Sequence, residues 1–316
     1  MNINRLGLSD IRCLADLLGC DQVLLEQIAS NKSRHYGSFF RKKADGGKRE
    51  ITPPREPLLS IQRRLKHHFN SKLTWTHVVH GGIADRSTIS NALPHVGKHQ
   101  VVNLDISSFF PSVKPEYIRL ALVRAGCASA VAALLSELVS YKDGLPQGSP
   151  TSTIIGNLVL EPMDSDFMAL CNKHGFVYTR YVDDITISGS IDINPWRQGL
   201  IDIVRRAGFD VAAKKIHFSN RSERQVVTGL VVNTKLRPTK DYISELRGTI
   251  RRCWPENEGL TQVADENGLR PDEMLRMLRG QVGYVKSVDK PLGRGIRGLM
   301  VNILKKTPEA KSVSIL

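Results

Sequence analysis

The N-terminal part of the chain combines helical and strand-like patterns of apolar residues. Apolar residues at helical spacing predict two short helices, capped by the side chains of Ser9 and Asp21. Strand-like stretches at 35–43 and 48–52 flank the sequence Ala44-Asp45-Gly46-Gly47. Because Asp and Gly tolerate positive φ, this tetrapeptide predicts a hairpin turn.

The middle of the chain alternates strand and helix. An apolar strand is predicted at 101–106, and two further strands at 176–181 and 185–188. Between them, helical patterns cover 115–141 and 152–170 and are separated by a turn-rich loop. No long low-complexity linker and no internal repeat interrupts the alternation. Both strands and helices therefore contribute to this part of the chain.

From about residue 239 the pattern becomes entirely helical. Three apolar faces recur at helical spacing, made of Ile243, Leu246 and Ile250, of Leu275, Leu278, Val282 and Val285, and of Ile296, Leu299 and Ile303. The pattern predicts a separate helical unit at the C-terminus.

The net charge of the chain indicates what kind of partner it binds. The 316 residues include 45 Lys or Arg and 31 Asp or Glu, which gives a formal charge of +14 at pH 7. Residues 31–72 alone hold twelve Lys or Arg against three acidic residues, so basic side chains line the predicted hairpin. An excess of this size predicts a polyanionic partner. A composition of 41% hydrophobic and 24% charged residues excludes wholesale disorder.

The pattern of cysteines and apolar stretches indicates the cellular compartment in which the protein is expected. The five cysteines are scattered and contain no Cys-x-x-Cys pair, so neither a disulfide framework nor a thiolate zinc site is indicated. The most apolar stretch, 125–139, is too short to span a bilayer and contains Glu137. The first ten residues lack the apolar core of a signal peptide. We therefore expect a cytoplasmic protein without a membrane partner.

Three carboxylates form the sharpest candidate site. Asp105 lies at the end of one predicted strand, and Asp183 and Asp184 lie at the tip of a predicted hairpin. If these strands are neighbours, the carboxylates converge, and such a cluster is tolerated mainly when it holds hard cations such as Mg²⁺. Two such ions about 3.5–4 Å apart support nucleotidyl transfer with a pyrophosphate leaving group. An Asp-Asp pair alone is weak evidence, because acidic residues commonly stabilise turns.

The surrounding motifs place these carboxylates in a family context. Tyr181-Val182-Asp183-Asp184 is a form of the Tyr-x-Asp-Asp box of reverse transcriptases, and the strand with Asp105 looks like their first catalytic motif. Leu145-Pro146-Gln147-Gly148-Ser149-Pro150, followed by Asn157, looks like the motif between them. All three occur in the order of the family. The chain therefore resembles reverse transcriptases from its first helices to about residue 233.

Two further strings are similar to signatures of the retron type found in bacteria. Asn91-Ala92-Leu93-Pro94-His95 resembles the Asn-Ala-x-x-His signature, and Val227-Thr228-Gly229 resembles the Val-Thr-Gly triplet. Together they favour a retron enzyme over group II intron and diversity-generating relatives. We expect Asn91 and His95 to contact RNA. The alternative for His95 is a helix-end or core histidine satisfied by the backbone.

The resemblance implies a role for each residue at the predicted centre. Asp105, Asp183 and Asp184 would be the catalytic residues and would bind two Mg²⁺ ions, with the Ile106 carbonyl as an extra ligand. Because adjacent strand residues point oppositely, only the bend of the hairpin would let both Asp183 and Asp184 approach the metals.

The resemblance also implies contacts to the nucleotide substrate. Phe110 resembles an aromatic gate whose ring would clash with a ribose 2′-OH, so the implied substrate is a deoxynucleotide. Phe109 is expected in the core, and a core role for Phe110 as well is the alternative. Gln147 would support the nascent base pair through its amide.

Basic residues are the candidates for phosphate contacts. Arg49 aligns with the hairpin arginine that grips the triphosphate, and Lys43 and Lys48 are weaker candidates, with solvated surface charges as the alternative. The fourth motif, 208–216, departs from the family because the usual Asn and Thr are replaced. It keeps Lys214-Lys215, of which Lys215 could donate a proton to pyrophosphate or only bind backbone phosphate.

The helical C-terminal region resembles a polymerase thumb that holds the template–primer duplex. Arg247 and Arg251 lie opposite one apolar face, and Arg276 and Arg279 flank another, which makes them candidates for RNA contacts. The alternative is a helical bundle with ordinary charged faces. The resemblance therefore implies an α+β, right-hand polymerase fold, whose fingers and palm are followed by a helical thumb. The predicted domains are N-terminal helices and fingers at 1–100, a palm with inserted finger helices at 101–238, and a thumb at 239–316.

The family implies RNA-directed synthesis of DNA. A cognate structured non-coding RNA would be template and primer, with synthesis from an internal guanosine 2′-OH that leaves branched RNA-linked DNA. The implied partners are this RNA, the RNA–DNA hybrid product, deoxynucleoside triphosphates and a separate effector protein in anti-phage defence. The alternatives are an abortive-infection or group II-like reverse transcriptase, a non-catalytic RNA-binding scaffold, and a metal-dependent nuclease.

Overall fold

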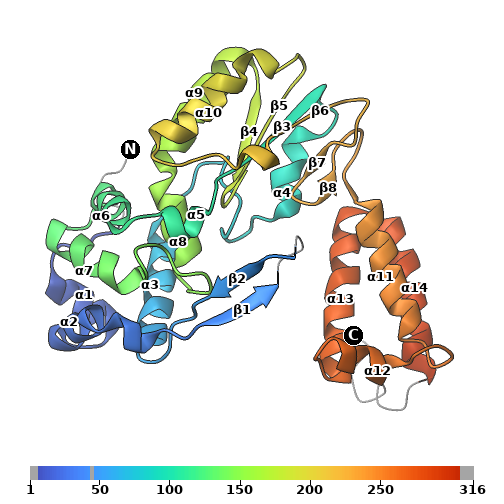
Figure 1. Cartoon of the computed structure of the whole chain (residues 1–316), viewed down its shortest axis with the longest axis horizontal. Coiled ribbons are helices and arrows are strands. Elements are labelled where there is room, and N and C mark those ends of the chain that lie inside the picture. Colours follow the sequence, from blue (N-terminus) through green and yellow to red (C-terminus); the bar gives the residue numbers. More distant parts are fainter. Residues whose placement is uncertain (1–5, 43–45, 307–316) are drawn as a thin grey trace. The chain divides into compact units, whose positions relative to one another are not determined.

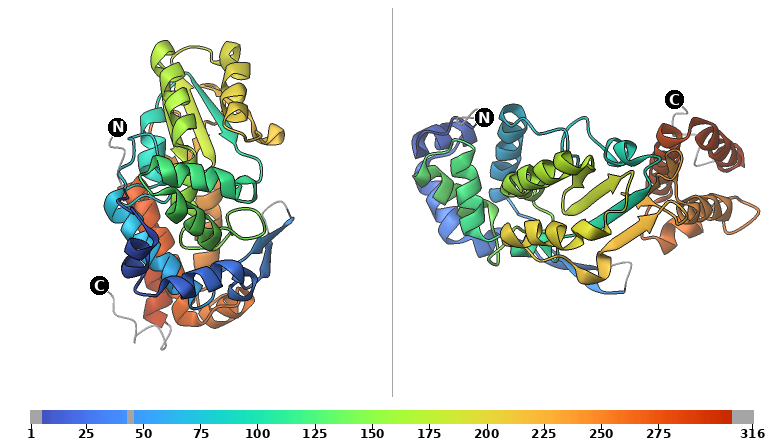
Figure 2. Two further views of the ribbon diagram at one scale, coloured as in Figure 1. Left: turned by 90° about the vertical axis from the view of Figure 1, so that its left-hand side faces the viewer. Right: turned by 90° about the horizontal axis from the view of Figure 1, so that it is seen from above.

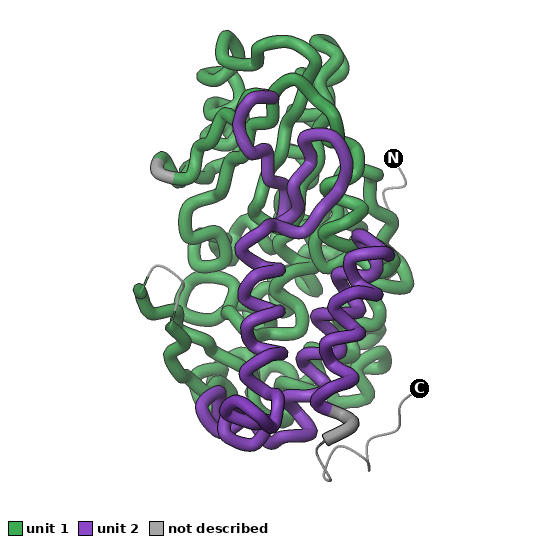
Figure 3. Tube along the Cα trace, turned by 90° about the vertical axis from the view of Figure 1, so that its right-hand side faces the viewer, with its two compact units in different colours: residues 1–220 green, residues 221–316 purple. Residues whose placement is uncertain are grey.

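The computed structural model describes residues 6–42 and 46–306. Residues 43–45, which include part of the predicted hairpin turn and one of the candidate lysines, lie outside the described ranges. The chain forms two compact units, unit 1 over residues 1–220 and unit 2 over residues 221–316 (Figure 3). In the described ranges, no helix has both the length and the apolar character needed to cross a bilayer.

A four-stranded antiparallel sheet forms the centre of unit 1 (Figure 1). Its strands lie in the order β4 (Val177–Tyr181), β5 (Asp184–Gly189), β3 (Gln100–Asp105) and β6 (His217–Asn220). The side chains of the central strands β3 and β5 are largely buried, which suits their β-branched and apolar composition. The three strands predicted in this region are confirmed.

Helices surround the sheet and continue into an N-terminal helical layer. They are α1 (Ile11–Leu18), α2 (Gln22–Ser30), α3 (Leu58–Lys72), α4 (Thr88–Ala92), α5 (Phe109–Ser112), α6 (Pro115–Arg124), α7 (Ser129–Val139), α8 (Ser152–Val159), α9 (Glu161–His174) and α10 (Arg197–Arg206), with the 3₁₀ turns η1 (Lys32–His35), η2 (Leu93–His95), η3 (Asn194–Trp196) and η4 (Ala213–Lys215). Helix α9 packs beside β4, α10 packs on α9, and α2 and α6 pack on α7 (Figure 2). One hydrophobic core joins these helices to the sheet.

Two predicted helices are each divided in the structure. The helix predicted at 115–141 is α6 and α7, because Gly126 between them has a φ of 95°, which ends a helix. The helix predicted at 152–170 is α8 and α9, which meet at Leu160. Pro162 lies in the first turn of α9, where its missing N–H favours the start of a new helix.

The caps of the first two helices were predicted with one error. Asp21 caps α2 as expected, because its carboxylate accepts a hydrogen bond from the Leu24 N–H at 2.7 Å. Helix α1 is capped by Asp10 and not by Ser9, since the Asp10 carboxylate accepts from the Cys13 N–H at 2.8 Å. Both residue types are good caps, so composition alone did not fix the position.

A basic two-stranded hairpin projects from the helical layer. Strands β1 (Phe39–Lys42) and β2 (Lys48–Ile51) pair antiparallel (Figure 1). The Lys142 ammonium lies 2.7 Å from the Glu50 carboxylate and ties β2 to the segment after α7. The hairpin is therefore anchored at its base.

Unit 2 combines a small sheet with a helical bundle. Its elements are β7 (Val226–Val227), β8 (Leu230–Val231), β9 (Arg237–Pro238), α11 (Lys240–Arg252), α12 (Leu260–Glu266), α13 (Pro271–Val288) and α14 (Lys290–Lys306). Residues of all three predicted apolar faces, such as Leu246, Leu278 and Ile296, are buried in a core that shares no residue with the core of unit 1. The α+β fold class is confirmed.

The separate cores predict a local effect of a core truncation. Leu278→Ala should lower the free energy of unfolding of unit 2 by about 2–5 kcal/mol, because it removes buried methyl groups and leaves a cavity. Hydrogen exchange should then show lost protection over residues 240–303 and unchanged protection in β3 and β5. Met277→Ala, at an exposed neighbouring position, is the control. Equal loss of protection in both units would contradict the prediction.

Candidate active site

Antiparallel pairing places the three predicted carboxylates at one end of the sheet. Asp105, the last residue of β3, lies directly opposite Asp184, the first residue of β5. Asp183 lies in the two-residue turn from β4 to β5, and its carbonyl accepts a hydrogen bond from the Ile106 N–H at 3.3 Å. The juxtaposition expected from the sequence is therefore present.

This proximity changes the ionisation of the carboxyl groups. Burial, followed by the charges of Asp183 and Asp105, raises the pKa of Asp184 to about 7. Burial and the charge of Asp105 also raise the pKa of Asp183. Neighbouring carboxylates disfavour their joint ionisation, so a positive charge among them would be strongly stabilised.

Lys215 supplies one such positive charge. Its Nζ lies 2.8 Å from Oδ2 of Asp105, and this hydrogen bond raises the pKa of Lys215. The fourth motif packs along the end of β3, since the Ser107 N–H donates to the Asp210 carbonyl at 2.7 Å and the Ala212 N–H donates to the Asp105 carbonyl at 2.8 Å. The motif reaches the site although its usual Asn and Thr are missing.

The donor set suits a hard divalent cation. Three carboxylates offer only oxygen ligands, and Asp105 and Asp184 face each other across the strand pair. Among the described residues, no group of three His, Cys, Asp or Glu side chains is arranged so that it could hold a metal ion by itself. Ions such as Mg²⁺ often use one or two carboxylates and complete their shell with water and substrate phosphates. The residues therefore fit a cation that binds together with a nucleotide.

The carboxylates line a cavity of about 1130 Å³. Its lining includes five further residues that the sequence predicted, namely Arg49, Ile106, Phe110, Gln147 and Lys215. Lys48 is not among the described residues of the lining. Neighbouring side chains on a strand point to opposite faces, so β2 presents Arg49 to the cavity and directs Lys48 away from it.

Two adjacent aromatic residues differ in their surroundings. Both residues line the cavity, but Phe109 is only 2% exposed and belongs to the core, whereas Phe110 is partly exposed. Their ring centroids are 5.3 Å apart. Ser108 has a left-handed φ of 47°, which bends the chain sharply between Asp105 and these rings. The structure thus separates the two phenylalanines as predicted.

The loop with Gln147 is fixed by contacts to neighbouring elements. The Thr52 N–H donates to the Gln147 carbonyl at 2.7 Å, and the Ser149 hydroxyl donates to Oε1 of Gln62 at 2.6 Å. Gln62 is fully buried on α3. The backbone of Gln147 is therefore held at the cavity wall.

Helix α3 contributes residues that the sequence analysis missed. Arg63 and Lys66, three positions apart, line the cavity together with Leu59. The available signal was the concentration of Lys and Arg over residues 31–72. It could not show which face of α3 meets the site, because that depends on packing against the loop at 145–150.

The predicted RNA contacts of Asn91 and His95 do not fit their positions. Both side chains are fully buried. The ring nitrogens of His95 lie 2.7 Å from the hydroxyls of Ser188 on β5 and Thr179 on β4, and burial lowers its pKa to about 3. His95 is thus a neutral core histidine. The alternative interpretation expected a core histidine that bonds to the backbone, whereas the structure shows bonds to two side-chain hydroxyls.

The arginines of unit 2 that were predicted to contact RNA differ in their surroundings. Arg247 and Arg251 are exposed on α11 and line a groove of about 720 Å³ together with Arg237 and Lys240. On α13, the guanidinium of Arg276 lies 2.8 Å from the Asp272 carboxylate. Arg279, one turn further along α13, is partly buried.

The second string that resembles a retron signature, Val227-Thr228-Gly229, forms the β7–β8 turn. Thr228 and Gly229 have φ values of 45° and 80° there.

Comparisons with known proteins agree with this site. The family model for reverse transcriptase (RNA-dependent DNA polymerase) matches residues 42–238. The retron Mx162 reverse transcriptase of Myxococcus xanthus is 30% identical over 91% of this chain, which spans 65% of that relative. The retron Ec86 reverse transcriptase of Escherichia coli is 25% identical, with 96% of this chain and 93% of that relative covered. A solved structure of telomerase from Candida albicans with a fragment of telomeric RNA aligns with 93% of this chain and 65% of that chain, at 12% identity and a TM-score of 0.46.

The matched family region contains all three carboxylates, the loop at 145–150 and Lys215. The family consists of nucleotidyltransferases that depend on a divalent metal, which agrees with the oxygen donor set of the cavity. The prediction of a right-hand polymerase fold is confirmed by this match. The chain therefore belongs to the reverse transcriptase family, and retron reverse transcriptases are among its relatives.

Proposed function

We propose that the protein is an RNA-directed DNA polymerase. The observation that carries the proposal is the convergence of Asp105, Asp183, Asp184 and Lys215 in one cavity with Phe110. In the reaction, a primer hydroxyl oxygen bonds to the α-phosphorus of a deoxynucleoside triphosphate. The bond from that phosphorus to its bridging oxygen breaks, and pyrophosphate leaves. The hydroxyl loses its proton to solvent, and pyrophosphate gains a proton from Lys215.

In this mechanism the three aspartates and the Ile106 carbonyl would hold two Mg²⁺ ions. When bound, these ions activate the attacking hydroxyl and stabilise charge on the leaving pyrophosphate. Lys215 retains its proton before the reaction, because its contact with Asp105 raises its pKa.

Other residues of the cavity would select and orient the nucleotide. The planar guanidinium of Arg49 suits bidentate contact with the triphosphate. Lys48 would add only a longer-range charge. Phe110 would exclude a ribose 2′-OH, and Gln147 would support the nascent base pair.

The retron relatives support a more specific proposal. The template and primer would be one cognate structured RNA, and synthesis from an internal guanosine 2′-OH would yield branched RNA-linked DNA. The net charge of +14 fits an RNA partner. In this proposal residues 1–100 form N-terminal helices and fingers, 101–238 the palm with its inserted finger helices, and 239–316 a thumb that holds the RNA–DNA hybrid. The enzyme would act in the cytoplasm with a separate effector protein in anti-phage defence.

A non-catalytic RNA-binding scaffold and an abortive-infection or group II-like reverse transcriptase are the competing functions. The intact carboxylates and their contact with Lys215 disfavour the scaffold. The strings at 91–95 and 227–229 favour the retron type over the other reverse transcriptases. Analysis of the bound nucleic acid separates the three.

The metal-binding role of Asp183 is tested by an isosteric change. Asp183→Asn removes a charge and should lower primer extension on an RNA template by at least about 100-fold, beyond the 10–100-fold typical of residues that only support metal ligands. Chelation of Mg²⁺ should have the same effect on the unaltered protein. Asp166→Asn, at an exposed position of α9, is the control and should retain full activity. Extension by Asp183→Asn at the unaltered rate would exclude the proposed mechanism.

The gate role of Phe110 is tested by a smaller side chain. Phe110→Val should raise the ratio of kcat/KM for UTP to that for dTTP by at least about tenfold, which corresponds to about 1.4 kcal/mol of lost discrimination. Phe69→Leu is the matched control, since Phe69 is buried in the same core but is not among the described residues that line the cavity, and it should leave the ratio unchanged. If Phe110→Val leaves the ratio unchanged, sugar selection lies elsewhere.

The retron proposal is tested by the nucleic acid that copurifies from native cells. The deproteinised sample is treated with RNase and, separately, with debranching enzyme. Single-stranded DNA whose mobility changes after both treatments, and which is missing with Asp183→Asn, is the expected result. A single RNA without DNA would favour the scaffold, and unbranched DNA of mixed sequence would favour the abortive-infection type.

A further inference from the structure

The Asp183 carboxylate is carried by a strained turn. Tyr181 pairs with Asp184, which leaves Val182 and Asp183 as the two turn residues. Val182 has a left-handed φ of 61°, which is unusual for a β-branched residue. Such a conformation persists only where the surroundings hold it. The contacts of this turn therefore decide where Asp183 lies.

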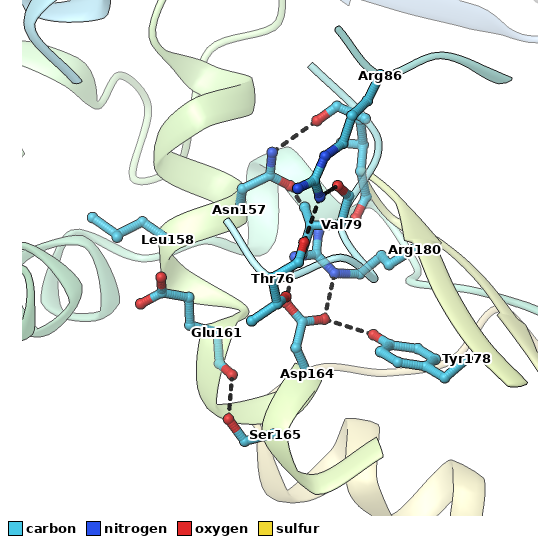
Figure 4. A network of polar contacts seen from close by, with 12 residues as sticks. Thr76, Val79, Arg86, Asn157, Leu158, Glu161, Asp164, Ser165, Tyr178 and Arg180 are labelled. Carbon is cyan, nitrogen blue, oxygen red and sulfur yellow. Dashed lines mark hydrogen bonds and ion pairs between the residues drawn. The ribbon is translucent and has the colours of Figure 1, made fainter. Parts of the chain in front are cut away.

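Arg180, a fully buried arginine of β4, takes part in a network of polar contacts with Asp164, Tyr178 and Asn157 (Figure 4). Nε and Nη2 of Arg180 donate to the two carboxylate oxygens of Asp164, each at 2.7 Å, and Asp164 also accepts from the Tyr178 hydroxyl at 2.6 Å. Nη1 of Arg180 donates instead to the Val182 carbonyl at 2.7 Å and to Oδ1 of Asn157 at 2.8 Å. Asp164 therefore neutralises the buried positive charge of Arg180, and Nη1 of Arg180 remains available to bind the Val182 carbonyl in the turn.

Asn157 extends this contact to the opposite side of the turn. Its Nδ2 donates to the Gly81 carbonyl at 2.8 Å. Gly81 lies so close to the turn that a Cβ at this position would overlap the backbone nitrogen of Val182. The segment with Gly81 is fixed to β4, because the His80 N–H donates to the Arg180 carbonyl at 2.8 Å. Val182 is thus held at its carbonyl and packed at its nitrogen.

We propose that Arg180 and Asn157 are positioning residues that place the Asp183 carboxylate for divalent-cation binding. This inference rests on the proposed role of Asp183 as a metal ligand. If the network served stability alone, loss of any of its bonds would lower only the unfolding temperature. The positioning role predicts weaker cation binding when a bond toward the turn is removed, and unchanged binding when the Tyr178 bond is removed.

The first test compares Asn157→Asp with Tyr178→Phe in the full-length protein. Asn157→Asp keeps the acceptor for Arg180 but loses the donor to the Gly81 carbonyl, whereas Tyr178→Phe removes a bond that does not reach the turn. Mn²⁺ binding is measured by electron paramagnetic resonance in the presence of a non-hydrolysable deoxynucleoside triphosphate analogue, because substrate phosphates are expected to complete the cation shell. The same variants are compared for kcat, the KM for dNTP and the unfolding temperature. Asn157→Asp should weaken Mn²⁺ binding and lower kcat by about 10–100-fold with little change in KM. Tyr178→Phe should leave Mn²⁺ binding and kcat unchanged.

Gly81→Ala reaches the turn without altering the buried ion pair. Gly81 does not have a left-handed φ, so alanine is compatible with its backbone and acts only by displacing Val182. It should reproduce the loss of Mn²⁺ affinity and kcat if Asn157→Asp fails to fold. Gly199→Ala on α10, where an added Cβ makes only an ordinary contact with Leu170 at 3.9 Å, is the matched control.

The outcomes separate this inference from the proposed function. Unchanged Mn²⁺ affinity and kcat in folded Asn157→Asp and Gly81→Ala would overturn the positioning role, as would an equal loss in Tyr178→Phe. The proposed function would stand in both cases, provided that the unaltered protein extends a primer and Asp183→Asn does not. If the unaltered protein extends no primer, the proposed function fails, and the Mn²⁺ titrations still decide the positioning role.

Discussion

The antiparallel pairing of β3 with β5 is the constraint on which the rest of the structure depends. It places Asp105 opposite Asp184, and like charges that face each other across a strand pair destabilise a sheet. Lys215 offsets part of this repulsion from the fourth motif. The remaining repulsion favours the binding of cations. The ionised state of the three carboxylates becomes favourable once a positive charge lies among them.

A buried ion pair holds the strand and the turn that carry Asp183. Arg180 and Asp164 are both buried, and a buried ion pair is tolerable only when its hydrogen bonds are satisfied. Burial alone would lower the pKa of Arg180, but the charge of Asp164 outweighs it and keeps the guanidinium ionised. The four-stranded sheet of unit 1 therefore has charge repulsion at the end where the three aspartates lie and a neutralised, hydrogen-bonded ion pair beside it.

Local sequence patterns predicted the elements more reliably than their ends and surroundings. The strands and Asp105, Asp183 and Asp184 were predictable because strand periodicity and family motifs are local signals. The divisions of the helices at Gly126 and Leu160 were missed, because apolar periodicity continues through both. The burial of Asn91 and His95, and the cavity face of α3 with Arg63 and Lys66, follow from tertiary packing, which no local pattern encodes.

The two separate hydrophobic cores have a consequence for how such enzymes diversify. The buried residues of α11–α14 belong to one core, and those around the catalytic sheet belong to another. Substitutions on the surface or in the core of the helical unit therefore leave the packing around the aspartates intact. The helical unit can therefore change by ordinary point mutation without compensating changes around the three aspartates.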